Sequence, residues 1–474
     1  MKINKEFDTI AAIATPLGQG AIGIVRLSGD KSLNILGKVF NGNTVTVSHY
    51  MYYGEIHNNG EIIDEVMVCA MLKPRSYTRE DTVEIYAHGG MLVLQGILEA
   101  LVSNGARLAE AGEFTKRAFL NGRLNLTQAE AVMDIIGASS ETARRAGLRQ
   151  LGGGLSRRLE NVRDKILSWL AHIELSIDYP EHEEEAKNSS IIQEEAISML
   201  GELKALLKTA EIGRVLRDGV KTAIVGLPNV GKSTLLNAIL SEDRAIVTKY
   251  AGTTRDVLTE RVVVGGVPLI LMDTAGIRET TDEIEQMGIE KSIEAAKEAD
   301  LILYVVDVTE ECEHENTELL KRLGLNNTPP VIFLLNKFDV SPAFRSDNAI
   351  PIFVELFSES AWNFGFTPTC KIPISARTGQ GLDEIFSKIK ELFFYGNLKN
   401  TGNEDIITRE RHRFLIEKTI EHMQTAVNEL EIGVPEDLVS NRLRSAYLVL
   451  GEILGVEIDD DIADRIFAEF CVGK

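Results

Sequence analysis

The sequence feature that most constrains this chain is a glycine-rich loop, Gly226-Leu-Pro-Asn-Val-Gly231-Lys232-Ser233, which directly follows the apolar run Thr222–Val225. It matches the pattern GxxxxGK[ST], and the helical run Thr234–Ile239 comes next, which is the context that the pattern requires. Backbone N–H groups of such a loop cradle phosphates at a helix N-terminus, while Lys232 reaches the β- and γ-phosphates and the Ser233 hydroxyl binds magnesium. The predicted nucleotide contacts here are Asn229, Val230, Gly231, Lys232, Ser233 and Thr234.

Two further loops are predicted to sense the γ-phosphate. The segment Asp273-Thr-Ala-Gly276 follows the apolar run Leu269–Met272, so its acid can hold magnesium through the ion's shell and the Gly276 amide can meet the phosphate. Thr254 lies between the two motifs, at the place of a switch threonine that closes on magnesium. The predicted contacts are Thr254, Asp273, Thr274, Ala275 and Gly276.

The base of the nucleotide is predicted to be guanine. Asn336-Lys337-Phe338-Asp339 ends the apolar run Val331–Leu335, and its carboxylate can accept hydrogen bonds from N1–H and the exocyclic amine of guanine, a donor pair that adenine lacks. Ser375-Ala376-Arg377, after the next strand-like run, offers a backbone N–H to the guanine oxygen. Five such elements in order, with strands before the phosphate- and base-reading loops, predict a GTPase.

Ile277 stands after Gly276, where Ras-type GTPases place the glutamine that orients the attacking water. Isoleucine cannot hydrogen-bond to water, so another group must do so. The acidic stretch Glu279–Glu285 holds the candidates, although a solvated loop face explains any single one of these acids equally well.

Composition narrows the class of protein. A chain of 474 residues is too long for one core and should form several domains. No apolar run approaches the roughly 18 residues of a membrane span, and the N-terminus has no apolar core of a secretory signal, so we expect a cytoplasmic protein without a membrane segment. The 4 dispersed cysteines fit a reducing compartment. A net charge of −21 argues against a chain that coats nucleic acid by itself.

The order of apolar runs predicts the elements outside the motifs. Short runs from residue 8 to about 118 predict a small α+β domain. Steps of three and four predict one long helix over Gln128–Tyr179, with a kink or close contact at Gly152–Gly154, since each glycine costs roughly 1 kcal/mol. A second helix is predicted over Ile191–Leu216.

Strand-like runs and helical segments then alternate, which predicts a mostly parallel sheet covered by helices, before the chain becomes helical again after Phe394. The predicted strands are Thr222–Val225, Leu269–Met272, Leu301–Val308, Val331–Leu335 and Ile372–Ile374. We therefore predict a multidomain α+β and α/β protein whose P-loop α/β domain is inserted into a helical domain. The predicted domains are residues 1–120, 121–217, 218–394 and 395–474.

Over nearly its whole length the chain resembles the MnmE (TrmE) family of tRNA-modification GTPases. The GTPase motifs are shared with the wider Era-like group, whereas the N-terminal segments and the tail are specific to the family. The segments that carry the resemblance are Gly226–Thr234, Gly252–Asp256, Asp273–Glu279, Tyr77–Glu84, His88–Gly90, Gly112–Arg123 and Cys471–Lys474.

The resemblance implies an N-terminal folate-binding domain that also dimerises, a helical domain, and a G domain activated by potassium-dependent dimerisation. With the FAD-containing flavoprotein MnmG, in a heterotetramer-type complex, such proteins add an aminomethyl-type group to carbon 5 of the wobble uridine of tRNA. The one-carbon unit comes from 5,10-methylene- or 5-formyl-tetrahydrofolate. The implied folate contacts are Arg26, Glu84, Arg123 and Lys474, whose types suit a pterin donor pair and the carboxylates of a folate tail.

The sequence and the family resemblance together suggest further roles for single residues. Asn229 has a side-chain carbonyl that can bind potassium, and the family pattern adds Thr248, Tyr250 and Thr253 as ligands, with Glu285 orienting the water. Cys471 is a candidate thiol nucleophile or relay, and a tail that only packs on the pocket is the alternative. The stretch between Asp339 and Ser375 is longer than expected for the family and is predicted to form an extra surface element.

Two other functions stay open at this point. One is an Era-like GTPase switch in ribosome assembly, which would need an RNA-binding module that the sequence does not display outside the G domain. The other is a stand-alone folate-dependent transferase with a regulatory GTPase, which would need no flavoprotein.

Overall fold

The computed structural model describes residues 8–178, 189–241, 260–272, 290, 292–310, 313–324, 329–340, 369–394, 405–456 and 460–473. The chain forms two compact units. Unit 1 comprises Met1–Met133, Gln150–Gly201 and Phe414–Lys474, and unit 2 comprises Asp134–Arg149 and Glu202–Arg413. Each unit therefore contains segments that are far apart in the sequence.

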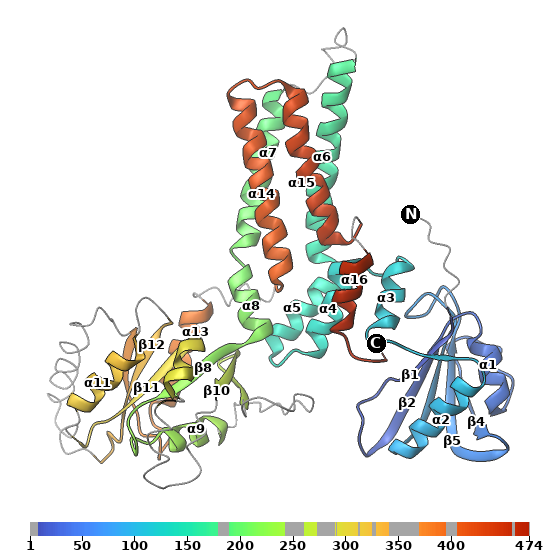
Figure 1. Cartoon of the computed structure of the whole chain (residues 1–474), viewed down its shortest axis with the longest axis horizontal. Coiled ribbons are helices and arrows are strands. Elements are labelled where there is room, and N and C mark those ends of the chain that lie inside the picture. The colour runs from blue at the N-terminus through green and yellow to red at the C-terminus, as the bar shows by residue number, and fades with distance from the viewer. Residues whose placement is uncertain are drawn as a thin grey trace. The chain divides into compact units, whose positions relative to one another are not determined.

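The N-terminal part of unit 1 is a seven-stranded sheet with one face covered by two helices, α1 (Ser32–Val39) and α2 (Met91–Ser103) (Figure 1). Its strand order is β3-β4-β5-β6-β2-β1-β7, and only the β1–β7 pair is parallel. The strands are β1 (Ile10–Ile13), β2 (Gly20–Ser28), β3 (Phe40–Gly42), β4 (Met51–Asn58), β5 (Glu61–Met71), β6 (Thr82–Gly89) and β7 (Arg107–Leu108). The predicted α+β fold is confirmed.

The side chains of β6 alternate between the two faces of the sheet, and this alternation separates its apolar core residues from its polar ones. Val83, Ile85 and Ala87 are buried with the helices, in one apolar core. Because successive side chains of a strand point to opposite faces, Glu84 and Tyr86 lie on the face opposite α1 and α2.

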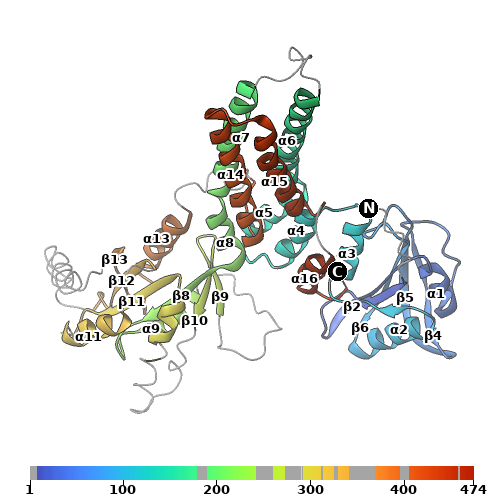
Figure 2. The ribbon, with the colours of Figure 1, turned by 45° about the horizontal axis from the view of Figure 1, so that its top comes forward.

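The rest of unit 1 is helical. The helices α6 (Gly154–Asp178), α7 (Ser189–Leu207), α14 (Glu410–Glu431) and α15 (Glu436–Leu454) run side by side in both ribbon views (Figures 1 and 2). The contacts between α6 and α15 join segments from before and after the α/β part of the chain. The helical domain is therefore interrupted by an inserted α/β domain, as predicted. Shorter helices are α3 (Glu113–Leu120), α4 (Leu126–Ile136) and α16 (Asp460–Ala468).

The prediction of one long helix over Gln128–Tyr179 is wrong. The structure has α4, α5 (Glu141–Leu151) and α6 in its place, and the break between α5 and α6 falls at the predicted glycines, where Gly153 has φ +79°. Side-chain hydrogen bonds hold the break: Gln128 Nε2 donates to the Leu151 carbonyl at 2.9 Å and Gln150 Nε2 to the Thr127 carbonyl at 2.8 Å. Apolar spacing alone does not reveal such breaks, because the core stripe continues across them.

The predicted helix over Ile191–Leu216 is likewise two helices, α7 and α8 (Ala210–Asp218). The hydroxyl of Thr209, between them, donates to the Leu206 carbonyl at 2.7 Å and accepts from the Ile407 N–H at 3.1 Å. A threonine that bonds to nearby backbone in this way competes with helix continuation.

Unit 2 contains a six-stranded sheet in the order β13-β12-β11-β8-β10-β9, in which all pairs are parallel except β9–β10. Its strands are β8 (Val220–Val225), β9 (Glu260–Val264), β10 (Val267–Met272), β11 (Leu301–Asp307), β12 (Val331–Asn336) and β13 (Cys370–Pro373). Helices α9 (Lys232–Ser241), α11 (Glu313–Leu323) and α13 (Leu382–Phe394) accompany it. Strands β11 and β12 are buried throughout, as parallel strands between helical layers must be.

All five predicted strands of this sheet are present, but the sequence analysis missed β9. A usable signal was there, since Gly265 and Gly266 separate two valine-rich runs and both have positive φ, +58° and +89°. A Gly-Gly pair between such runs indicates a tight hairpin.

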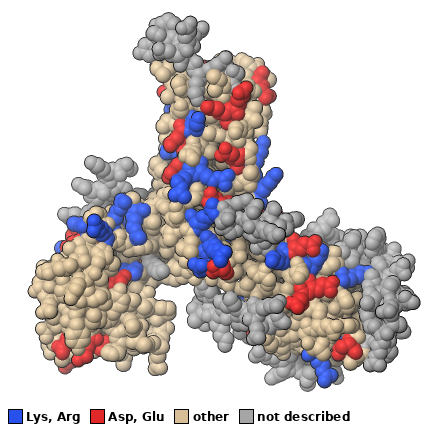
Figure 3. Space-filling view, turned by 180° about the vertical axis from the view of Figure 1, so that it is seen from behind, with Lys and Arg blue, Asp and Glu red and all other residues tan. Residues whose placement is uncertain are grey.

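Acidic and basic side chains lie among one another on the surface shown in Figure 3. Glu141, for example, accepts hydrogen bonds from Arg144 and Arg145, which lower the pKa of this exposed carboxyl to about 2. Within the described ranges, no three His, Cys, Asp or Glu side chains gather as a metal site would require. No helix among the described residues has both the length and the apolar character needed to cross a membrane.

Two helical glycines give a matched test of the packing. A Cβ on Gly213 in α8 would lie 1.9 Å from the Ile407 carbonyl oxygen, whereas a Cβ on Gly201 in α7 would meet nothing within 4 Å. We expect Gly213→Ala to destabilise the protein by about 1–3 kcal/mol or more through backbone displacement. Gly201→Ala should stabilise it by roughly 0.5–1 kcal/mol. The midpoints of urea unfolding measure both, and a Gly213→Ala midpoint equal to the parent's would contradict the close approach of α8 to Ile407.

Candidate functional sites

The glycine-rich loop joins the end of β8 to the first residue of α9, Lys232. Two of its glycines are required by close contacts: a Cβ on Gly226 would lie 2.3 Å from the Val305 carbonyl oxygen, and a Cβ on Gly231, at φ +100°, would lie 2.3 Å from Asn336 Nδ2. The loop is thus pressed against the carboxyl ends of β11 and β12.

The ammonium group of Lys232 lies over this loop. Its Nζ donates to the carbonyl oxygens of Gly226, at 2.9 Å, and Leu227, at 2.6 Å. Ser233 and Thr234 follow in the first turn of α9, half-buried and exposed respectively, and Asn229 is exposed at φ +60°. A cation and the N–H groups of a helix N-terminus at one loop form a site for a phosphate.

Asn336 connects the loops of this site. Its side chain is 2% exposed, its Nδ2 donates to the Val230 carbonyl at 2.7 Å, and its Oδ1 accepts from the Ala376 N–H at 2.9 Å. One buried amide therefore ties the phosphate loop to the segment that follows β13.

The predicted base-reading groups lie at the same edge of the sheet. Asp339 is half-exposed, and in the part of the chain that the structure describes its carboxylate meets no hydrogen-bond donor and no cation. The Ser375 N–H donates to the Gln380 carbonyl at 2.9 Å, and the Ala376 N–H is taken by Asn336. Among the N–H groups of Ser375–Arg377, that of Arg377 is the one without an acceptor in the described residues.

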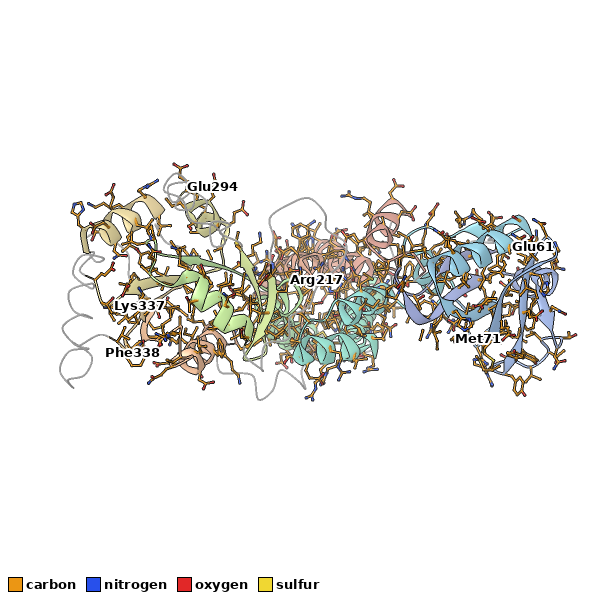
Figure 4. The ribbon with its side chains drawn as sticks, turned by 90° about the horizontal axis from the view of Figure 1, so that it is seen from below. Glu61, Met71, Arg217, Glu294, Lys337 and Phe338 are labelled. Carbon is orange, nitrogen blue, oxygen red and sulfur yellow. The ribbon has the colours of Figure 1, made fainter. Side chains whose placement is uncertain are left out.

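Sequence analysis missed Asp307, which ends β11. It is 6% exposed and accepts hydrogen bonds from Lys337 Nζ, at 2.5 Å, and from the N–H and hydroxyl of Thr309, at 2.9 and 2.6 Å. Burial alone would raise the pKa of Asp307, but the bonds from Lys337 and Thr309 outweigh it and lower the pKa. Lys337, labelled in Figure 4 beside Phe338, directly follows β12. The available signal was an acid at the end of an apolar strand.

Several predicted residues of the nucleotide site lie outside the described residues: Thr248, Tyr250, Thr253, Thr254, Asp273, Thr274, Ala275, Gly276 and Glu285. The same holds for Lys474 and for most of the long stretch between Asp339 and Ser375.

A second cluster lies on the face of the N-terminal sheet opposite α1 and α2. Arg26 on β2 faces Glu84 on β6 in the strand register, with Nε to Oε1 2.9 Å and Nη2 to Oε1 2.7 Å. The Tyr86 hydroxyl donates to Glu84 Oε2 at 2.6 Å. Burial and this hydrogen bond raise the pKa of Tyr86 to about 12, so the phenol stays a donor at neutral pH.

Tyr77, which sequence analysis did not assign a role, lies between two arginines. The Arg26 and Arg123 guanidinium carbons are 5.8 and 4.6 Å from its ring centroid, and Arg123 Nη1 donates to the Tyr77 carbonyl at 2.8 Å. The structure thus brings Arg26, Glu84 and Arg123 together, although Arg26 and Arg123 are 97 positions apart in the sequence. Tyr77 opens one of the family-specific segments, and that position was the available signal.

The C-terminal tail is attached to the same cluster. Arg26 Nη1 donates to the Gly473 carbonyl at 3.0 Å, and the Gly112 N–H donates to the Cys471 carbonyl at 3.3 Å. Gly473 has φ +92°, and a Cβ there would lie 2.5 Å from the Ile13 carbonyl oxygen. Cys471 has an exposed thiol. The other thiol near this cluster is that of Cys69 on β5, which pairs with Glu84 on β6, and burial raises its pKa.

Family models match most of the chain. The model for "GTP-binding protein TrmE N-terminus" matches residues 9–123, and the model for "MnmE helical domain" matches residues 126–471.

Individual relatives match it throughout. The protein of Streptococcus pneumoniae (strain Hungary19A-6) named "tRNA modification GTPase MnmE" is 45% identical over 477 residues, with 100% of both chains covered. The protein of the same name from Lactococcus lactis subsp. lactis (strain IL1403) is 44% identical with the same coverage. A solved structure of Era in complex with MgGDPNP and 16S ribosomal RNA nucleotides is 33% identical, covering 35% of this chain and 54% of that one, with a TM-score of 0.27, which is too low to carry an inference.

Proposed function

Because this chain belongs to the MnmE family of tRNA modification GTPases, we propose that it hydrolyses GTP at the phosphate loop of unit 2 in order to modify tRNA. The target is carbon 5 of the wobble uridine, which receives an aminomethyl-type group. The observation that carries the nucleotide part is the Asn336 amide, which joins the phosphate loop at Val230 to Ala376 in the segment Ser375–Arg377.

Each described residue of the nucleotide site has a role in this proposal. The N–H groups of the loop and the ammonium of Lys232 bind the phosphates, and the half-exposed carboxylate of Asp339 accepts from the guanine edge. The Arg377 N–H, which has no acceptor among the described residues, would donate to the guanine oxygen. Binding to a positively charged, preorganised loop stabilises the charge that develops as the γ-phosphate leaves.

Two metal ions are expected to assist. The Ser233 hydroxyl, in the first turn of α9, suits magnesium, and the side-chain oxygen of the exposed Asn229 suits potassium. When bound, these cations would neutralise charge on the phosphates, which is the task of an arginine finger in other GTPases. The further potassium ligands Thr248, Tyr250 and Thr253, the magnesium ligand Thr254 and the water-orienting Glu285 complete the proposed site.

The cluster at Arg26 and Glu84 is the proposed folate site. The Glu84 carboxylate, on the face of the sheet opposite α1 and α2, suits the paired donors of a pterin, while Arg123 and Lys474 suit the carboxylates of a folate tail. Bound tetrahydrofolate would supply the one-carbon unit. Arg26 also holds the tail through Gly473, which keeps Cys471 near the site as a candidate nucleophile or relay.

The proposed assembly is a homodimer that acts with the flavoprotein MnmG and tRNA in the cytoplasm. The net charge of −21 supports shared handling of tRNA, because this chain lacks the excess of cations that would bind a polyanion alone.

The choice of guanine tests the nucleotide site. Asp339→Asn should weaken GTP binding by about a hundredfold, since two charge-assisted hydrogen bonds are lost, and should shift preference toward xanthine nucleotides. Competition binding with GTP and XTP measures this. Full GTP affinity with the original base preference in the variant would show that Asp339 does not read the base.

Potassium activation tests the proposed catalytic electrostatics. GTP hydrolysis should be fast in potassium, slow in sodium and steeply dependent on protein concentration, because G-domain pairing orders the potassium ligands. Asn229→Ala should lose the difference between the salts, and Glu285→Ala should bind GTP normally but hydrolyse it poorly. Equal rates in both salts, with Asn229→Ala as active as the parent, would exclude this mechanism.

Calorimetry with a reduced folate tests the second site. The heat of binding should disappear when Arg26→Ala and Glu84→Ala are combined, because both groups of the cross-strand pair are removed.

Cys471→Ser should still bind folate and hydrolyse GTP but fail to modify tRNA. Unchanged folate binding in the double variant would remove the pocket, and normal modification in Cys471→Ser would refute a chemical role for the thiol.

A further inference from the structure

We propose that Asp307 is a positioning residue for guanine recognition, which acts by fixing the turn Lys337–Val340 that presents Asp339. This inference rests on the proposed nucleotide site. It assigns to Asp307, outside the recognised motifs, a part in selecting the base.

The position of Asp307 in the sheet connects it directly to the turn Lys337–Val340. It ends β11, and in the parallel register it lies opposite Asn336, the residue that ties the loops together. The backbone continues the connection, since the Val308 N–H donates to the Asn336 carbonyl at 3.1 Å. The residue directly after β12 is Lys337, whose ammonium meets the Asp307 carboxylate.

The Asp307 carboxylate is held by contacts other than the one with Lys337. One of its oxygens, Oδ1, accepts from the N–H and the hydroxyl of Thr309, in the turn that follows β11, and the other, Oδ2, accepts from Lys337. The Asp307 side chain is 5% exposed and that of Lys337 36% exposed, so one partner of the pair is held inside the protein. A charge-assisted bond to such a fixed acceptor is stronger than a bond between neutral groups.

Lys337 needs this support because its backbone is strained. It has φ +65°, a left-handed conformation that costs a side-chain-bearing residue roughly 1–2 kcal/mol. Other contacts of the turn are the Val340 N–H to the Lys337 carbonyl, at 3.2 Å, and the Phe338 N–H to the Ile374 carbonyl, at a long 3.4 Å. The ion pair with Asp307 is thus the shortest contact that holds the strained residue.

The expected consequence is loss of base selection rather than loss of phosphate binding. Asp339 follows Lys337 by two residues, and reading guanine requires both oxygens of its carboxylate to be aligned with two donors of the base. A turn that relaxes would disturb this alignment, whereas Lys232 and the phosphate loop keep their own hydrogen bonds.

The test compares GTP with ITP, whose base lacks the exocyclic amine that Asp339 is proposed to read. Asp307→Asn keeps the volume and an acceptor for Thr309 but removes the charge that holds Lys337. We expect the ratio of GTP to ITP affinity to fall by about tenfold, the equivalent of one charge-assisted hydrogen bond. A general effect on folding would not change this ratio.

Asp300→Asn is the matched control, since Asp300 lies next to the opposite end of β11 and also forms an ion pair, with Arg214 at 3.3 Å. It should leave the ratio at the parent's value. If Asp307→Asn does not fold, Thr309→Val, which removes one anchor of the carboxylate, should lower the ratio in the same direction. If the variant that folds, Asp307→Asn or otherwise Thr309→Val, has the parent's ratio of GTP to ITP affinity, the inference is overturned.

The Asp339→Asn variant separates this inference from the proposed function. If Asp339→Asn abolishes the preference for GTP over ITP, adding Asp307→Asn to it should produce no further change in the ratio. A further fall would show that Asp307 acts on selectivity by another route and would overturn the inference. If Asp339→Asn leaves base preference intact, the proposed base-reading site itself is wrong.

Discussion

The buried side-chain amide of Asn336 is the interaction on which the nucleotide site depends. Its donor meets the carbonyl of Val230 in the phosphate loop, and its acceptor meets the N–H of Ala376 beyond β13. Few side chains offer both functions in one planar group, and an aspartate at this position would lose the donor. A buried group left unpaired costs about 1–3 kcal/mol, so the phosphate loop and the segment after β13 that is proposed to contact the base are held in one arrangement.

The N-terminal site is built differently, from a cross-strand ion pair that also receives the end of the chain. The register of β2 and β6 places Arg26 opposite Glu84, and the remaining Nη1 of the same guanidinium holds the Gly473 carbonyl, 447 residues away. Five donors in a fixed planar fork allow one arginine to bond to both. The tail therefore reaches this site through backbone atoms, which leaves the Cys471 side chain exposed.

The sequence was sufficient for the parts of the structure that repeat with a period or obey a local motif. Buried parallel strands appear as uninterrupted apolar runs, and the phosphate loop needs its glycines at Gly226 and Gly231 for contacts that any such loop makes. Glycines at 152–154 predicted a kink where α5 and α6 separate, but apolar spacing did not reveal a full break there or near Thr209, because hydrogen bonds between side chains and distant backbone decide both. The approach of Arg26 to Glu84 and of Asp307 to Lys337 likewise depends on strand register, which a single sequence does not reveal.

Residues with a strained backbone also differ in whether the sequence could have predicted them. Among the described residues, those other than glycine with positive φ are His49, Asn59, Arg79, Asn229 and Lys337, of which the last two belong to the nucleotide loops. Asparagine tolerates this conformation through its short polar side chain, so Asn229 could be anticipated in a turn after Pro228. Lysine has no such tolerance, and only the surrounding structure can hold Lys337 there. Strain that persists in this way concentrates at functional sites, and here it lies two residues from the carboxylate proposed to select guanine.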